Sequence, residues 1–435
     1  MVNLPPKNDT SIFYRDLIKQ LILSVSSPLH AILPDNMKNN IIELQQALKK
    51  YTGLTSTLYY AMKVNRSVTL LQTAIKEGLG IDVSSENELK LALSRGADSS
   101  NCSLSGPCKS DEFIELGILA GSIIAVDSYD ELLLTTNIAE STNKTARVML
   151  RWNGGVSCSR YGMPFSDLKR ISKNIKNESY IKLVGFSFHL PGYSPLDRAG
   201  CLASILELSS QLQKQGIDVE KVNIGGGIPI SYISKESWNQ YHANISKAKF
   251  YKNQAPKDYY PYWNSSSKER FINQVLVNHD NIERLSSLGI ELILEPGRAL
   301  VDNAGFSVFE VLGLKKTELG DNCIIVRGLS FSACEVWCNS EFLVDPILIP
   351  RTTNNKKRPM YAYIAGQSCL EDDLITKRLV AFERSPVRGD LLVFNNTAGY
   401  QMDLMESRFH HLPIPKKVAL NCYRTDISWT VEEAM

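Results

Sequence analysis

A repeated alternation of short apolar runs with longer helical patterns extends from about residue 55 to residue 298. This alternation is typical of βα units wound around a parallel sheet. Eight parallel strands over about 250 residues predict a (β/α)8 barrel. The eight runs are Thr57–Val64, Gly80–Ser84, Asn101–Ser105, Ser122–Asp127, Arg147–Trp152, Leu183–His189, Lys221–Ile224 and Glu291–Leu294.

A second domain is expected, because 435 residues exceed the size at which one hydrophobic core stops growing. After residue 300 the pattern changes to alternating segments separated by Gly, Pro and Asn. We therefore predict an α/β protein with a barrel over 35–300, a mostly β C-terminal domain over 301–435, and an N-terminal segment, 1–34, that packs with the β domain. The segments that indicate the β domain are Gly305–Leu314, Asn322–Val326, Met360–Ala365 and Asp390–Phe394.

An insertion over 231–270, between the seventh and eighth predicted strands, is rich in aromatic residues. Its density of aromatic side chains is severalfold above the chain average of 9%. A segment of this composition is ordered against something else rather than a loose linker. Two interpretations stay open, a packed lid or dimer contact and a direct contact with substrate. The aromatic residues are Tyr232, Trp238, Tyr241, Phe250, Tyr251, Tyr259, Tyr260, Tyr262 and Trp263.

Charge and cysteine content argue against several classes of protein. A formal net charge of +2 does not favour nucleic acid or an anionic membrane surface as a partner. No stretch reaches the roughly 18 to 20 apolar residues that span a bilayer, and the N-terminal segment does not resemble a signal peptide. The 9 cysteines have no regular framework, which is typical of free thiols in a reducing compartment. We expect a cytoplasmic protein.

Polar residues at the ends of the predicted barrel strands are the candidates for chemistry, because active sites of such barrels lie at the C-terminal ends of the strands. Lys63 closes the first strand, where desolvation is expected to lower its pKa toward the neutral amine that forms a Schiff base. His189 ends the sixth strand. Gly225–Gly227 follow the seventh, and three glycines let backbone N–H groups approach an anion. Glu295 and Arg298 follow the eighth.

Five motifs occur in one order along the chain: Y-A-x-K-x-N at Tyr60–Asn65, D-V-x-S-x-x-E-L at Asp82–Leu89, G-G-G, E-P-G-R, and C-x-x-x-D at Cys369–Asp373. Together they resemble the fold-type III pyridoxal-phosphate family, which includes ornithine, arginine and diaminopimelate decarboxylases and alanine racemase. The resemblance covers nearly the whole chain and implies pyridoxal 5'-phosphate as the cofactor. It also points to a little-characterised branch of the decarboxylases.

The resemblance implies a role for each motif residue. Lys63 carries the cofactor as a Schiff base, and Glu295 keeps the pyridine nitrogen protonated. His189 lies against the ring, and Cys369 of the partner subunit reprotonates the product, so that a homodimer shares its active sites. The remaining cofactor-binding residues are Asp82, Gly225, Gly226, Gly227, Gly297, Arg298 and Tyr400.

Two departures from the family pattern concern the phosphate and the substrate. The usual H-x-G-S is one residue longer here, from His189 to Ser194, and Ser194 is the candidate for the phosphate-binding serine. Leu370 follows the cysteine where an acidic residue usually reads the distal amine. Glu371, Asp372 and Asp373 remain as candidate substrate-binding residues, and we expect simple diamino acids to be poor substrates.

The leading hypothesis is therefore a pyridoxal-phosphate-dependent amino-acid decarboxylase. An amino-acid racemase or epimerase and a catalytically inactive regulatory homologue are the alternatives. Racemases of this fold place an arginine beside the ring nitrogen, so Glu295 favours decarboxylation. No metal site is expected, because Cys334 and Cys338 have no matching second pair. The identity of the amino acid stays open.

Overall fold

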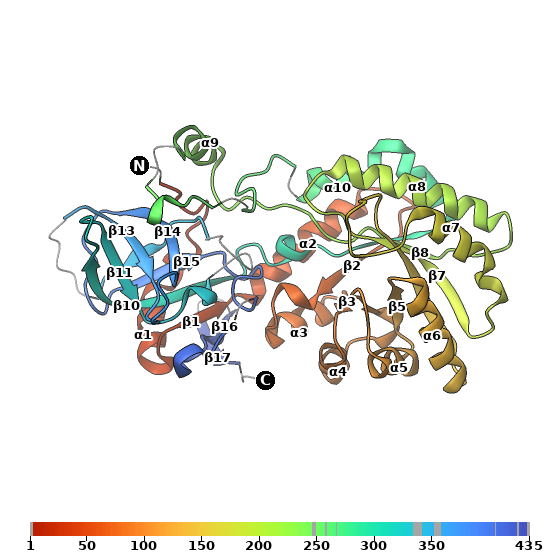
Figure 1. Ribbon diagram of the computed structural model, residues 1–435, viewed down its shortest axis with the longest axis horizontal. Coiled ribbons are helices and arrows are strands. Elements are labelled where there is room, and N and C mark those ends of the chain that lie inside the picture. The colour runs from red at the N-terminus through yellow and green to blue at the C-terminus, as the bar shows by residue number, and fades with distance from the viewer. Residues whose placement is uncertain are drawn as a thin grey trace.

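The computed structural model describes residues 3–245, 249–256, 259–266, 268–333, 342–351, 358–404, 406–423 and 426–432. Figure 1 shows a barrel wrapped by helices at one end of an elongated molecule and a mostly β domain at the other. The predicted fold class is confirmed. None of the helices in these ranges is both long and apolar enough to cross a membrane.

Eight parallel strands close into the predicted barrel. Their residues are almost all buried, because the barrel interior and the surrounding helices cover both faces. The predicted runs match the observed strands to within a few residues. The strands are β2 (Ser56–Ala61), β3 (Gly80–Val83), β4 (Cys102–Leu104), β5 (Ile123–Val126), β6 (Ala146–Trp152), β7 (Ile181–Phe188), β8 (Lys221–Asn223) and β9 (Glu291–Leu294).

Serine side chains begin many of the helices that follow the strands. Each hydroxyl accepts the N–H of the third helical residue, as Ser67 does from Leu70 at 3.2 Å. The caps fix where the chain turns at the end of a strand, and so shape the mouth of the barrel. The helices of this region are α2 (Pro34–Lys49), α3 (Val68–Lys76), α4 (Glu86–Ser94), α5 (Asp111–Ala120), α6 (Tyr129–Ser141), α7 (Phe165–Asn174), α8 (Pro195–Gln213), α10 (Lys268–Val277), α11 (Asn281–Leu288) and α12 (Gly297–Leu300).

The second domain is a sheet in the order β14-β13-β11-β10-β1-β16-β17, with β15 paired to β10 and to β12. Strand β1 comes from the N-terminal segment and lies between β10 and β16. Helix α1 (Arg15–Val25) packs Ile18, Leu21 and Val25 onto this sheet. The strands are β1 (Leu29–Ile32), β10 (Gly305–Lys316), β11 (Asn322–Val326), β12 (Ile347–Ile349), β13 (Met360–Ala365), β14 (Leu374–Phe382), β15 (Leu391–Asn395), β16 (Lys416–Tyr423) and β17 (Asp426–Val431).

The aromatic insertion contains α9 (Lys235–Asn244), which lies above the β domain in Figure 1. Tyr232 contacts Phe342 of the β domain with ring centroids 5.5 Å apart. Tyr260 contacts Tyr193 of the barrel at 4.9 Å. Phe250 forms an isolated bridge to Arg378 on β14. The insertion therefore holds the two domains together within one chain.

Candidate active site

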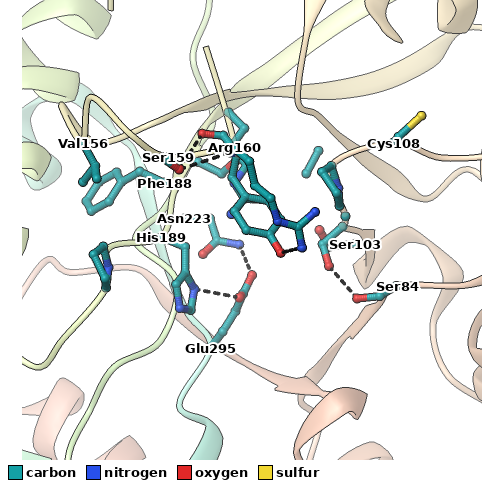
Figure 2. Close-up of a pocket in the computed structure, with 18 of the residues that line it drawn as sticks. Ser84, Ser103, Cys108, Val156, Ser159, Arg160, Phe188, His189, Asn223 and Glu295 are labelled. Carbon is teal, nitrogen blue, oxygen red and sulfur yellow. Dashed lines mark hydrogen bonds and ion pairs between the residues drawn. The ribbon is translucent and has the colours of Figure 1, made fainter. Parts of the chain in front are cut away.

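A cavity of about 630 Å³ opens at the C-terminal ends of the barrel strands. Figure 2 shows its walls, with Asn223 and His189 both directed at the carboxylate of Glu295. Lys63, His189 and Glu295, predicted from three different strand ends, line this one cavity. The full lining is Lys63, Ser84, Ser103, Ser105, Gly106, Pro107, Cys108, Ala125, Arg151, Val156, Cys158, Ser159, Arg160, Tyr161, Ser187, Phe188, His189, Pro191, Asn223 and Glu295.

Lys63 lies on a single 3-10 turn, Met62–Val64, directly after β2. The β domain holds this turn from outside the barrel. The N–H of Tyr400 donates to the carbonyl of Val64 at 2.8 Å, and the side-chain amide of Asn65 donates to the carbonyl of Ala398 at 2.9 Å. The position of the lysine is therefore set by both domains.

The expectation of a lowered lysine pKa is wrong for this arrangement. Burial alone would lower the pKa of Lys63. The nearby Asp82, Glu295 and Tyr400 raise it by more than burial lowers it, so the net shift is upward. The side chain extends into the cavity while protein surrounds its stem. In this state the amine is an ammonium ion, favoured by the charges of the nearby Asp82 and Glu295.

Asp82 lies at the end of β3, 2% exposed. Burial and the Glu295 charge raise the pKa of its carboxyl well above the usual range, against the effect of Lys63 and of a hydrogen bond from Ser105 at 3.1 Å. The other oxygen, Oδ1, has no hydrogen-bond partner among the described residues. A buried acceptor of this kind is available to a cation or to a bound donor.

Glu295 is oriented by Asn223 at the end of β8 and lies near His189, directly after β7. The side-chain amide of Asn223 donates to Oε1 at 2.7 Å, and His189 Nδ1 lies 4.0 Å from Oε2. Asn223 also accepts the N–H of Gly225 at 2.8 Å. One buried amide therefore couples the carboxylate to the glycine run.

His189 is a neutral imidazole at physiological pH. Burial and the positive charges of Lys63, Arg151 and Arg198 lower its pKa to about 3. Its Nδ1 accepts the N–H of Gly226 at 3.3 Å, which fixes Nε2 as the protonated nitrogen. The ring is thus a flat, uncharged surface at the cavity wall.

The glycine run needs its glycines for conformation and for space. Gly225 and Gly227 have φ values of +67° and +87°, which side chains rarely adopt. A Cβ on Gly226 would lie 2.5 Å from the carbonyl oxygen of Glu295. Any other residue would therefore close the space beside His189 and Glu295.

The other predicted phosphate residues gather around the same loops. A Cβ on Gly297 would lie 2.6 Å from the hydroxyl of Tyr400. The guanidinium of Arg298 lies 4.7 Å from the Tyr400 ring centroid and 4.3 Å from that of Tyr260. Ser194 is the N-cap of α8, and its hydroxyl accepts the N–H of Asp197 at 3.2 Å.

The C-x-x-x-D loop lies in the β domain, between β13 and β14, and none of its residues lines the cavity. In Figure 1 these strands lie at the far end of the molecule from the barrel. Cys369 is exposed. Asp373 is 4% exposed, and its carboxylate accepts the N–H groups of Ser330 at 2.7 Å and Ser368 at 3.1 Å. Asp373 therefore shapes the loop that presents Cys369.

The two acids beside Asp373 contact the aromatic insertion. Tyr251 donates its hydroxyl hydrogen bond to Glu371, and Lys252 forms an ion pair with Asp372 at 3.3 Å. Both acids are exposed.

The two cysteines considered for a zinc site, Cys334 and Cys338, lie outside the described residues. Within the described residues, no group of three His, Cys, Asp or Glu side chains could hold a metal ion.

Asn223 and Arg151 are among the cavity residues that were not predicted from the sequence. Each stands at or near the C-terminal end of a barrel strand, β8 and β6 respectively, so the rule that selected Lys63 also applies to them. Arg151 pairs with Asp127 at 3.0 Å, and its guanidinium lies 4.7 Å from the ring centroid of Tyr161. Both residues were therefore predictable from their positions at strand ends.

Residues 38–302 match the family model described as "Pyridoxal-dependent decarboxylase, pyridoxal binding domain". This range covers more than half of the chain and includes the whole barrel. The chain belongs to the pyridoxal-dependent decarboxylases. Pyridoxal phosphate is accordingly its cofactor.

Relatives within this decarboxylase family span most of the chain. An uncharacterised protein of Sinorhizobium fredii, y4yA, is 36% identical over 90% of this chain and 87% of its own length. A diaminopimelate decarboxylase of Methanocaldococcus jannaschii is 27% identical over 72% and 69%. The crystal structure of Helicobacter pylori diaminopimelate decarboxylase with L-lysine superposes with a TM-score of 0.74 at 20% identity, covering 96% and 97%. The structural likeness confirms the fold.

The residues at the barrel mouth fit the cofactor of a pyridoxal-dependent decarboxylase. Among the described residues, Asp82 Oδ1 has no hydrogen-bond partner, and neither has the buried hydroxyl of Ser187, which lines the cavity. The cavity holds one amine for an aldehyde, Lys63, and one carboxylate, Glu295. The glycine run leaves space that any Cβ would fill. These are the groups that a pyridine ring, an aldehyde and a phosphate require.

Proposed function

We propose that this protein decarboxylates an amino acid with pyridoxal phosphate held on Lys63. The observation that carries the proposal is the convergence of Lys63, His189 and Glu295 on one cavity at the barrel mouth. Bound pyridoxal phosphate supplies an electron sink for the electron pair that remains on Cα when carbon dioxide departs.

Each residue would act through its charge or its shape. Glu295 would hold a proton on the ring nitrogen, because an anionic partner raises the pKa of that nitrogen. Asn223 keeps the Glu295 carboxylate oriented through its 2.7 Å hydrogen bond. Neutral His189 would cover one face of the ring without adding a charge. Gly225–Gly227, Gly297, Arg298, Tyr400 and Ser194 would surround the phosphate.

We also propose a homodimer in which Cys369 of the partner subunit returns a proton to Cα. Support comes from the exposure of Cys369 and from its place in the β domain, away from the cavity of its own chain. The N–H of Cys369 donates to His410 at 3.3 Å, which ties the loop to the C-terminal part of the chain. A two-fold dimer would give two equal sites.

The substrate is proposed to carry a distal group other than an ammonium ion. Among the described residues that line the cavity, Glu295 carries the one carboxylate, whereas Arg151 and Arg160 are cations. Glu371 and Asp372 already contact Tyr251 and Lys252. A distal ammonium would therefore meet repulsion in the cavity and acids that have other partners.

The first experiment locates the cofactor and the reaction. The purified protein is expected to be yellow, and borohydride followed by peptide mass analysis should find a pyridoxyl group on Lys63. A screen of amino acids should then show carbon dioxide release, with ornithine, lysine and diaminopimelate as poor substrates. A colourless protein that added cofactor does not change would refute the proposal. Loss of optical activity without carbon dioxide release would identify a racemase instead.

A subunit-mixing experiment tests the shared site. Lys63→Ala and Cys369→Ala homodimers should each be nearly inactive. After free exchange in equal amounts, half of the dimers are mixed, and each mixed dimer has one intact site and one doubly damaged site. The expected recovery is about a quarter of wild-type activity, by counting over a symmetric pair. If exchange is confirmed independently and nothing is recovered, both residues act within one chain.

A further inference from the structure

Arg198 is a fully buried guanidinium that donates hydrogen bonds to backbone carbonyls on two loops. Its exposed fraction is 0%. Nε donates to the carbonyl of Gly226 at 3.0 Å, Nη1 to Ser194 at 3.0 Å, and Nη2 to Leu190 and Gly192, both at 2.9 Å. No ion-pair partner for it occurs among the described residues. A buried charge without a carboxylate is expensive unless its hydrogen bonds are met, and here four carbonyls meet them.

The three carbonyls of Leu190, Gly192 and Ser194 belong to the loop that is one residue longer than the family pattern. Arg198 stands on the first turn of α8, just after this loop, and its side chain folds back across it. A cation near a helix N-terminus is disfavoured by the helix dipole. The position of Arg198 is therefore explained by its hydrogen bonds to the loop and not by the helix.

The hydrogen bond to Gly226 has a consequence for the next N–H group. A trans peptide directs its C=O and its N–H to opposite sides. Because the Gly226 carbonyl points at Arg198, the N–H of Gly227 points away from the guanidinium, and it donates to no acceptor among the described residues. A Cβ on Gly227 would lie 2.0 Å from Nη2, so glycine is needed for this contact.

We propose that Arg198 is a positioning residue for the cofactor phosphate: it fastens the His189–Ser194 loop to the glycine run and directs the Gly227 N–H toward the anion. Its positive charge adds to the same effect, although the neighbouring Asp197 carboxylate partly offsets it. This inference rests on the proposed function, because it takes the glycine run as the phosphate site. Arg198 itself does not touch the cofactor.

Cofactor-depleted protein titrated with pyridoxal phosphate and with pyridoxal, which lacks the phosphate, tests the inference. A lysine cannot reach four carbonyls at once. Arg198→Lys should raise the Kd for pyridoxal phosphate on the order of 10- to 100-fold and leave the Kd for pyridoxal within about twofold. Gly227→Ala, which changes the residue that Arg198 contacts, should likewise weaken the binding of pyridoxal phosphate and not that of pyridoxal.

Arg378→Lys is the matched control. Arg378 is equally buried, at 1% exposed, and donates to the Leu343 carbonyl at 2.8 Å and to Asp345 at 2.7 Å in the β domain. It should leave both Kd values unchanged. Equal weakening of pyridoxal phosphate and pyridoxal in both site variants would show a general structural role and overturn the inference, as would unchanged binding. Wild-type protein that does not prefer pyridoxal phosphate over pyridoxal would overturn the phosphate site, and with it the proposed function.

Discussion

Replacing Asn223 should separate the two tasks that this buried amide performs. Its exposed fraction is 4%. Its Nδ2 donates to Glu295 at 2.7 Å, and its Oδ1 accepts from Gly225 at 2.8 Å. Asn223→Ala removes both bonds. Asn223→Asp keeps the acceptor for Gly225 but removes the donor to Glu295.

The expected cost follows from the two groups that lose a partner. A hydrogen bond to a charged group contributes about 1.5–3 kcal/mol, and a buried N–H without an acceptor costs about 1–3 kcal/mol. The cavity beside Glu295 offers its carboxylate some solvation, so the sum for Asn223→Ala should be about 2–4 kcal/mol of unfolding free energy. If the Glu295 bond acts in turnover, its loss lowers kcat ~10- to 100-fold.

Chemical denaturation between pH 5 and pH 7, together with kcat, distinguishes the two variants. The carboxylate introduced by Asn223→Asp faces Glu295, so its pKa is raised, and its penalty relative to wild type should grow as the pH rises. Asn223→Ala introduces no ionisable group, so its penalty should depend less on pH. If Asn223→Ala changes stability by less than about 0.5 kcal/mol and leaves kcat unchanged, the amide does not orient Glu295.

Two further predictions concern single residues. Glu295→Gln should retain the cofactor, measured by absorbance, but slow carbon dioxide release by orders of magnitude, because a neutral partner no longer holds the ring nitrogen protonated; unchanged turnover would remove Glu295 from this role. Buried His30 has its pKa lowered to about 3 by burial and by Lys417, so its contribution to stability is complete above pH 6.5 and is lost as the pH falls toward 3. His30→Asn should therefore reduce the slope of unfolding free energy against pH by about 1.4 kcal/mol per pH unit between pH 4 and 6, whereas His279→Asn, at an exposed position, should not.

The barrel could be predicted because its signals are local. Each strand is a short run of buried apolar residues, and β9 occupies the predicted range Glu291–Leu294 without change. The sheet of the second domain depends on pairing between distant segments. Strand β1 pairs Leu29 with Val308 and also with Lys416. No pattern within four residues can specify partners so far along the chain.

The properties of the active site likewise divide into those set by position along the chain and those set by contacts between distant segments. Lys63, His189 and Glu295 converge because strand ends of a closed barrel meet at one mouth, so position in the sequence sufficed to bring them together. The pKa of Lys63 could not be predicted from its place on a strand, since the direction of the shift depends on Asp82 and Glu295, which lie on or after other strands.

The role of Arg198 could not be predicted from the sequence pattern. It stands on a helix, where an arginine is ordinarily a solvated residue, and only the backward fold of its side chain onto the carbonyls of Gly192 and Gly226 reveals what the longer loop requires. The longer loop has backbone carbonyls at Leu190, Gly192 and Ser194 that need donors, and the buried Arg198 guanidinium supplies them. The departure from the family pattern and the unusual arginine are therefore two parts of one local arrangement.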